Sequence, residues 1–191
     1  MALVMTSAPA LEPVTVEEAK EHLRVDGTHE DVLISSLIVT SRLHIEAALG
    51  LSLVSQAWKL VLDAWPMDAV VNIPMRPVIA VNTITVFAAD GSGEVIEPAN
   101  YVVDLASSPP RIATQGATWP KPMRAVNGIE IDFVAGYGAM ASDVPAPIRH
   151  ALMLLVAHWY EHRDPIEIGS LRTAIPDSVS QLLKPFRMVR L

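Results

Sequence analysis

The hydrophobic pattern of this 191-residue chain changes period twice, and this change constrains its fold more than any other feature. Apolar residues recur at helical spacing before residue 50 and after residue 144. Between about residues 55 and 138 they alternate or form short β-branched runs, separated by Pro, Gly, Asn and Ser. The pattern predicts helices at both ends of the chain and short strands in its middle, which is an α+β fold.

Start and stop signals predict four helices. Thr15 followed by Glu18 has the spacing of a capping box, in which each side chain bonds the other residue's backbone N–H. Gly50 suits the end of a helix, and Pro165 and Pro185 follow two further periodic segments. The expected helices cover residues 15–25, 28–50, 145–163 and 176–183.

These elements predict a small helical bundle with an inserted small β-sheet domain. The bundle contains two N-terminal helices, one long C-terminal helix and one short C-terminal helix. We expect an N-terminal arm over residues 1–13, a helical core over 14–54 and 144–185, a β-rich insert over 55–143, and a C-terminal docking tail over 186–191.

Hydrophobic residues make up 51% of the chain and charged residues 18%, which excludes a disordered protein because such chains lack apolar surface. The longest uninterrupted apolar stretch, Ala151–Ala157, is much shorter than the roughly 20 residues of a membrane span. We therefore expect no membrane partner. A large interface with other subunits reconciles the apolar composition with a chain that does not enter a bilayer.

The net charge of −7 argues against a general nucleic-acid binder, which needs a basic surface. The absence of cysteine excludes disulfides, thiolate catalysis and cysteine zinc sites. Because no Lys or Arg precedes Lys20, the basic start of a signal peptide is missing, and we expect the chain to act in a cytoplasm or inside a particle.

One motif suggests catalysis. Residues His158, Glu161 and His162 match H-x-x-E-H, in which two histidines bind zinc and the glutamate acts as a base. A catalytic zinc also needs a third protein ligand, and the acids that follow, Asp164, Glu167 and Asp177, lie in or beside expected loops. His158 and His162 are thus weak candidates for a metal site. We expect no catalytic residue, metal or cofactor, and interpret the motif as the end of a helix.

The C-terminus combines basic and apolar residues on an acidic chain. This composition suits a segment that docks on a partner, although a tail folded onto its own domain would have the same pattern. The candidate contact residues are Leu182, Leu183, Phe186, Arg187, Arg190 and Leu191.

Several segments together resemble the phage head–tail connector, or adaptor, family, whose members also occur in prophages and gene transfer agents. The opening is the most specific part, with PVTVEEAKEHLRVD over residues 13–26 and EDVLISSLI over 30–38. The resemblance continues with VPAPI at 144–148, HWYEHR at 158–163 and LLKPFR at 182–187.

The resemblance implies a structural protein and no enzyme. Such adaptors form a ring, typically of twelve copies, beneath the portal at the DNA exit of the capsid. They join the portal to a stopper or tail-terminator protein. DNA passes through the lumen without sequence-specific binding, and the C-terminal segment reaches into the portal. The expected location is the head–tail junction of a virion or gene transfer agent particle, assembled in the bacterial cytoplasm.

Two alternatives remain open on the sequence alone. A zinc-dependent hydrolase would use the HxxEH helix and bind one zinc per chain. A stand-alone binding module would stay monomeric. The sequence is equally compatible with an infectious phage, a prophage and a gene transfer agent.

Overall fold

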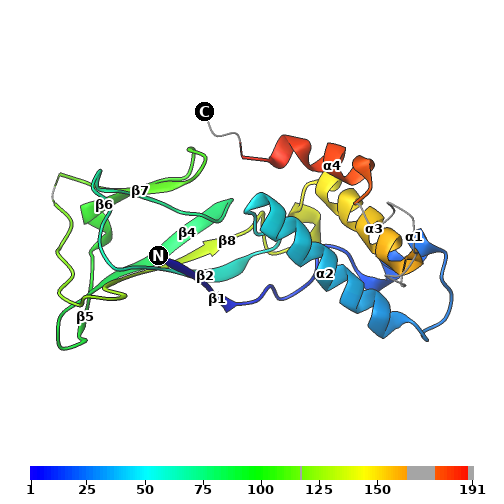
Figure 1. Cartoon of the computed structure of the whole chain (residues 1–191), viewed down its shortest axis with the longest axis horizontal. Helices are drawn as coiled ribbons and strands as arrows, with labels where there is room; N and C mark the ends of the chain where they lie inside the picture. The colour runs from blue at the N-terminus through cyan, green and yellow to red at the C-terminus, as the bar shows by residue number, and fades with distance from the viewer. Residues whose placement is uncertain (117, 163–174, 189–191) are drawn as a thin grey trace, which may run out of the picture. The chain divides into compact units, whose positions relative to one another are not determined.

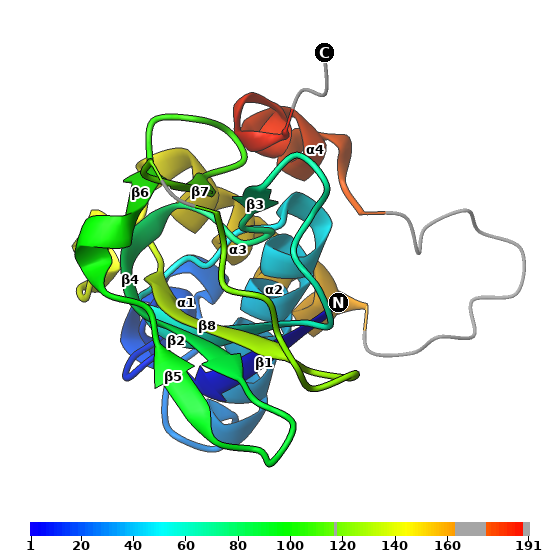
Figure 2. The same ribbon diagram turned by 90° about the vertical axis from the view of Figure 1, so that its left-hand side faces the viewer.

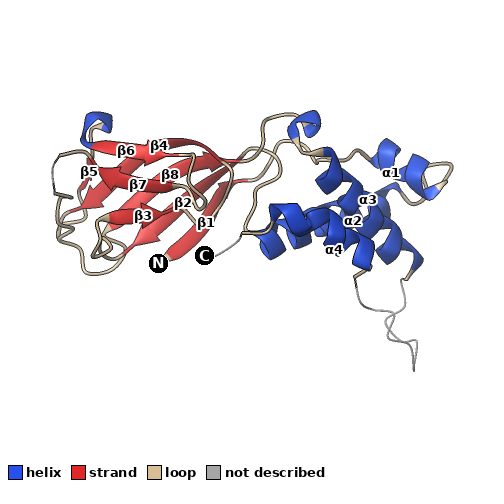
Figure 3. Ribbon diagram, turned by 90° about the horizontal axis from the view of Figure 1, so that it is seen from above, coloured by secondary structure: helices blue, strands red, loops and turns tan. Residues whose placement is uncertain are grey.

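The computed structural model describes residues 1–116, 118–162 and 175–188, and the chain divides into two compact units. The sheet unit consists of Met1–Ala10 and Gly50–Tyr137, and the helical unit of Leu11–Leu49 and Gly138–Leu191. Figure 3 shows the strands and helices that make up these units. The mixed helix-and-sheet composition expected from the hydrophobic pattern is confirmed.

The sheet unit contains two antiparallel sheets (Figure 2). The larger has the strand order β1-β2-β8-β4-β5, and the smaller the order β3-β7-β6. The strands are β1 (Ala2–Ser7), β2 (Gln56–Leu62), β3 (Val70–Asn72), β4 (Val78–Phe87), β5 (Gly93–Val95), β6 (Tyr101–Asp104), β7 (Arg111–Thr114) and β8 (Ile129–Ala135). A short 3-10 helix, Pro98–Asn100, precedes β6.

Alternation along the strands builds the core of this unit. In β8, Ile129, Ile131, Phe133 and Ala135 are buried, whereas the residues between them are partly exposed. They join a cluster that includes Ile112 of β7, so both sheets contribute to one core. A strand with one buried and one solvated face is typical of antiparallel sheets.

The N-terminal residues correct the expectation of an arm over residues 1–13. Ala2–Ser7 form an edge strand that pairs antiparallel with β2, with Leu3 opposite Leu60. The sheet unit also takes in Leu51–Val54, which we expected in the helical core, and forms two sheets in place of one. Pairing between segments about 55 residues apart in the chain is not visible in a local pattern.

Gly136 allows the end of β8 to approach a neighbouring segment closely. Its φ of 145° is one that side chains rarely adopt, and an added Cβ would lie 2.6 Å from the backbone nitrogen of Ser55. Its own N–H donates to the carbonyl of Pro77 at 2.8 Å. Only glycine meets both requirements at this position.

The helical unit contains α1 (Val16–Leu23), α2 (Asp31–Leu49), α3 (Ala146–Glu161) and α4 (Asp177–Leu183) among its described residues (Figure 1). Short 3-10 helices cover Ala141–Asp143 and Lys184–Phe186. Within this unit α3 contacts α1, α2 and α4. The core of the helical unit is built from side chains of all four helices. They include Ala19, Ile34, Ile38, Ile45, Ile148, Leu152, Leu155, Val179 and Leu183.

The predicted capping box at the start of α1 is confirmed. The backbone N–H of Glu18 donates to Thr15 Oγ1 at 3.1 Å, and that of Thr15 donates to Glu18 Oε2 at 2.9 Å. The hydrogen bond from Thr15 is the main cause that holds the pKa of Glu18 below its usual value, and Arg149 of α3 lowers it further through a 2.6 Å ion pair. One carboxylate therefore caps α1 and joins it to α3.

By length and composition alone, α2 is apolar enough to cross a membrane, although polar residues interrupt its apolar sequence. The core helix of a folded domain meets the same criterion. Here the buried residues of α2 include Arg42 and Glu46, which form an ion pair with each other.

Candidate docking surfaces

The C-terminal segment begins with α4, which packs on α3 through one face. Val179 and Leu183 are buried, at 1% and 7% exposure, and belong to the core of the helical unit. Leu182 and Phe186 are half-buried, and Arg187 is exposed. The six predicted contact residues therefore differ in the surface that they offer. Leu183 stabilises its own unit, while Leu182, Phe186 and Arg187 keep exposed surface.

Arg190 and Leu191, the other two predicted contact residues, lie outside the described residues. The backbone at Arg187 is extended, with φ of −69° and ψ of 140°, so the helical conformation ends before it. The last described helical turn is thus the 3-10 helix, Lys184–Phe186.

The HxxEH motif lies at the end of α3. The rings of His158 and His162 are 4.6 Å apart between centroids, and His162 Nδ1 lies 2.8 Å from the backbone oxygen of His158. Burial, and then the neighbouring His162, lower the pKa of His158, while Glu161 raises it. His162 is exposed at the C-cap and so provides no core contact.

No group of three potential metal ligands occurs among residues 1–116, 118–162 and 175–188. Of the acids considered as a third ligand, Asp164 and Glu167 lie outside the described residues, and Asp177 is exposed at the start of α4. The geometry of the described motif is that of a helix end, with a ring nitrogen near a terminal carbonyl.

In the sheet unit, two tryptophans hold two loops together. The rings of Trp65 and Trp119 stack with centroids 4.2 Å apart and planes inclined by 10°. Trp65 Nε1 donates to the carbonyl of Pro120 at 2.7 Å, and Trp119 Nε1 donates to that of Ala69 at 2.8 Å. We call residues 63–69 and 118–128 the tryptophan-clamped platform. The two tryptophans are 54 positions apart in the chain, so no local sequence pattern indicates that they pair.

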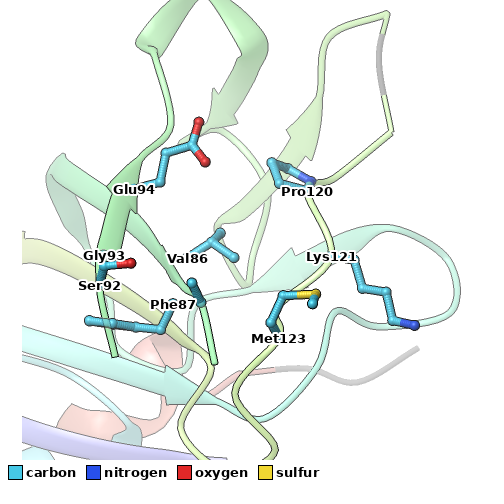
Figure 4. A pocket seen from close by; sticks show the side chains of 9 residues that line it. Val86, Phe87, Ser92, Gly93, Glu94, Pro120, Lys121 and Met123 are labelled. Carbon is cyan, nitrogen blue, oxygen red and sulfur yellow. The ribbon is translucent and has the colours of Figure 1, made fainter. Parts of the chain in front are cut away.

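A shallow hollow lies beside this platform. Figure 4 shows Ser92, Gly93 and Glu94 on one side of it and Pro120, Lys121 and Met123 on the other. The 120–124 segment is fixed to β4, because the N–H groups of Met123 and Arg124 both donate to the carbonyl of Phe87. This fixed backbone presents its side chains in a defined direction.

The outer face of the larger sheet carries a polar row. Lys59 Nζ lies 2.5 Å from Glu130 Oε2 and 3.8 Å from Asp132 Oδ1, and Thr83 Oγ1 donates to Asp132 at 3.1 Å. The hydrogen bond to Glu130 is the main cause that raises the pKa of Lys59. These paired charges make the face polar without leaving a free cation in the row.

Comparison with known proteins identifies the family of this chain. The profile of the phage gp6-like head-tail connector family matches residues 13–105. A chain of the structure "Virion of native gene transfer agent (GTA) particle" is 30% identical, with a TM-score of 0.85, over 100% of this chain and 97% of that one.

Two neck structures give a similar result. A chain of "Neck of empty GTA particle computed with C6 symmetry" is 31% identical with a TM-score of 0.84. A chain of "Neck of native GTA particle computed with C12 symmetry" is 29% identical with a TM-score of 0.78. Both alignments cover 100% of this chain and 97% of the other. Comparison with curated proteins gives no match.

The fold and the family are those of a structural head-tail connector, and not of an enzyme. This chain belongs to the phage gp6-like head-tail connector family. The resemblance recognised in the sequence is confirmed.

Proposed function

We propose that this chain is the head–tail connector subunit in the neck of a gene transfer agent-type particle, assembled in the bacterial cytoplasm. The observation that carries the proposal is the similarity over the whole chain to a protein of a neck computed with C12 symmetry. Twelve copies would form a ring beneath the portal and join it to a stopper or tail-terminator protein. DNA would pass through the lumen.

Composition supports an assembled role. Several large apolar side chains are exposed in both units, among them Val32 at 86% and Met67 at 107%. These side chains are available for contacts between subunits in an assembled particle. The net charge of −7 suits a channel that must not retain DNA, because phosphates are repelled from an acidic wall.

The C-terminal segment is our candidate for the portal contact. Leu182, Phe186 and Arg187 are the described residues of this surface, and Arg190 and Leu191 would extend it. Apolar anchors flanked by cations are suited to a partner groove with acidic edges.

The test is light scattering and negative-stain imaging of the chain mixed with the portal protein of its own particle. The expected result is a ring bound coaxially to the portal. Deletion of residues 186–191 should abolish portal binding while circular dichroism still reports the helical fold. A folded chain that stays monomeric with portal protein at several salt concentrations would contradict the proposal and favour a stand-alone binding module.

The matched control is Leu183→Ala. Because Leu183 is 7% exposed and packs inside the helical unit, its truncation should lower the free energy of unfolding by about 2–4 kcal/mol. Portal binding by the fraction that remains folded should persist. If Leu183→Ala abolished binding without loss of stability, Leu183 would itself contact the portal.

A further inference from the structure

The tryptophan-clamped platform displays apolar side chains that its own unit does not cover. Met67, Met123 and Val126 are 107%, 67% and 62% exposed. The stacked rings and the two indole hydrogen bonds keep these loops in place, so the side chains are held at the surface of a fixed support. Flexible methionine side chains on a rigid backbone adapt to the shape of a protein partner.

The same platform carries two cations that have no carboxylate partner among the described residues. Lys121 and Arg124 are exposed and form no ion pair with any residue of the described ranges. By contrast, Lys59 and Arg111 of the same unit each contact a carboxylate. Arg124 lies over the ring of Phe87, 5.5 Å from its centroid, which directs the guanidinium.

We propose that the tryptophan-clamped platform docks on an acidic surface of a second copy of this chain. The inference rests on the ring of the proposed function. A closed ring of identical subunits needs two different, complementary surfaces on each copy. Within the platform, residues 118–128 carry Lys121 and Arg124 and no acidic residue, while Asp63 and Asp68 lie in the other loop. On a chain with net charge −7, this basic and apolar segment complements exposed carboxylates of a second copy.

The acceptor that matches in charge is the exposed face of α1. Glu17 and Glu21 lie one turn apart, are exposed, and form no ion pair with the described residues. They line a hollow together with Asp26, Val25 and Gly27 and with the cations Lys20 and Arg24, so that three carboxylates outnumber two cations around it. This hollow would receive an apolar side chain such as Met123. Lys20, on the same helix, is engaged by Asp31 at 2.8 Å.

A DNA phosphate backbone is the competing ligand, and the platform favours protein. Three exposed apolar side chains gain nothing from phosphates, and the hollow beside Lys121 also contains Glu94. Tight binding of DNA also requires more than two cations, because the affinity for DNA grows with each phosphate that is neutralised.

The experiment measures ring formation on the portal protein for the full chain and its variants, together with portal binding per chain. Lys121→Glu with Arg124→Glu should raise the concentration needed for half-maximal ring formation roughly tenfold or more, because like charges then face each other. Further reversal of Glu17→Lys and Glu21→Lys in the same chain should restore it. The control is Arg111→Glu, a charge reversal at one residue of the sheet unit outside the platform. It should have little effect on the concentration needed for ring formation.

The outcomes separate this inference from the proposed function. If the wild-type chain forms no ring, the proposed function fails. The inference alone is overturned if the wild type forms rings and the Lys121/Arg124 variant does so equally well. It is also overturned if the variant with all four charges reversed does not recover ring formation. A Lys121/Arg124 variant that loses only its affinity for duplex DNA would overturn it as well.

Discussion

Arg42 and Glu46 form an ion pair inside the helical unit, one turn apart on α2. Arg42 Nη1 lies 2.8 Å from Glu46 Oε2, and the two side chains are 6% and 7% exposed. Arg42 Nε also donates to Glu12 Oε2 at 2.7 Å. Burial acts to lower the pKa of Arg42, but the two carboxylates more than offset it and raise that pKa. One guanidinium thus fixes the segment before α1 against α2.

Replacement of this guanidinium should destabilise the helical unit strongly. Arg42→Met removes the cation between Glu12 and Glu46 and leaves both carboxylates where they were. The expected loss in free energy of unfolding is about 3 kcal/mol, measured by urea denaturation. Lys20→Met, which breaks the more exposed pair with Asp31, should cost less than about 1 kcal/mol. Equal losses for the two variants would contradict a special role for the buried pair.

Gly136→Ala should destabilise the sheet unit more than an ordinary glycine substitution. The new methyl group would meet the backbone of Val54 and Ser55 at 2.6 Å, and the φ of 145° is strained for alanine. Strain and overpacking together predict a loss of about 3 kcal/mol or more.

The matched control is Gly91→Ala, in the turn between β4 and β5. Gly91 also has a positive φ, of 86°, but a Cβ there meets nothing within 4 Å. Only the backbone strain remains, so the expected loss is about 1 kcal/mol. Thermal unfolding of both variants would show the difference. If Gly91→Ala were equally damaging, close packing at Gly136 would not be the cause.

His158 should titrate below the usual histidine range. Burial and the nearby His162 disfavour its protonated form. Because the pKa of the folded state is the lower one, the unfolded chain binds the proton more readily. The stabilisation from neutral His158 is therefore complete above the unfolded pKa of about 6.5 and is lost as the pH falls toward the folded value.

Proton NMR of the imidazole resonances measures this directly. His162→Gln should raise the pKa of His158, because it removes the neighbouring imidazole that lowers this pKa, and Glu161→Gln should lower it further. The opposite signs for two adjacent substitutions make the result specific. A His158 pKa unchanged in both variants would place the effect in burial alone.

The helices were predictable because their signals are local. The capping box at Thr15 and the stop at Gly50 depend on residues a few positions apart, and both match the structure. The strand β1 has no such signal. All of its residues except Leu3 are exposed, so its sequence is not constrained to alternate between apolar and polar residues. Its conformation is set by pairing with β2, far along the chain.

The docking surfaces were predictable only in part. The basic, apolar composition near Phe186 and Arg187 is visible in sequence, but the burial of Leu183 is not, because it depends on which face of α4 meets α3. The stacking of Trp65 on Trp119 joins loops more than 50 residues apart. A single sequence contains no local sign of that contact.

The chain passes between its two units three times, after residues 10, 49 and 137. This interleaving affects how such genes can recombine. A single crossover between two related genes, anywhere from codon 11 to codon 55, would join β1 from one parent to β2 from the other, although these strands pair directly. Exchange of a complete unit needs several crossovers in one event. Recombination should therefore tend to transfer this connector as a whole gene, with both of its units matched.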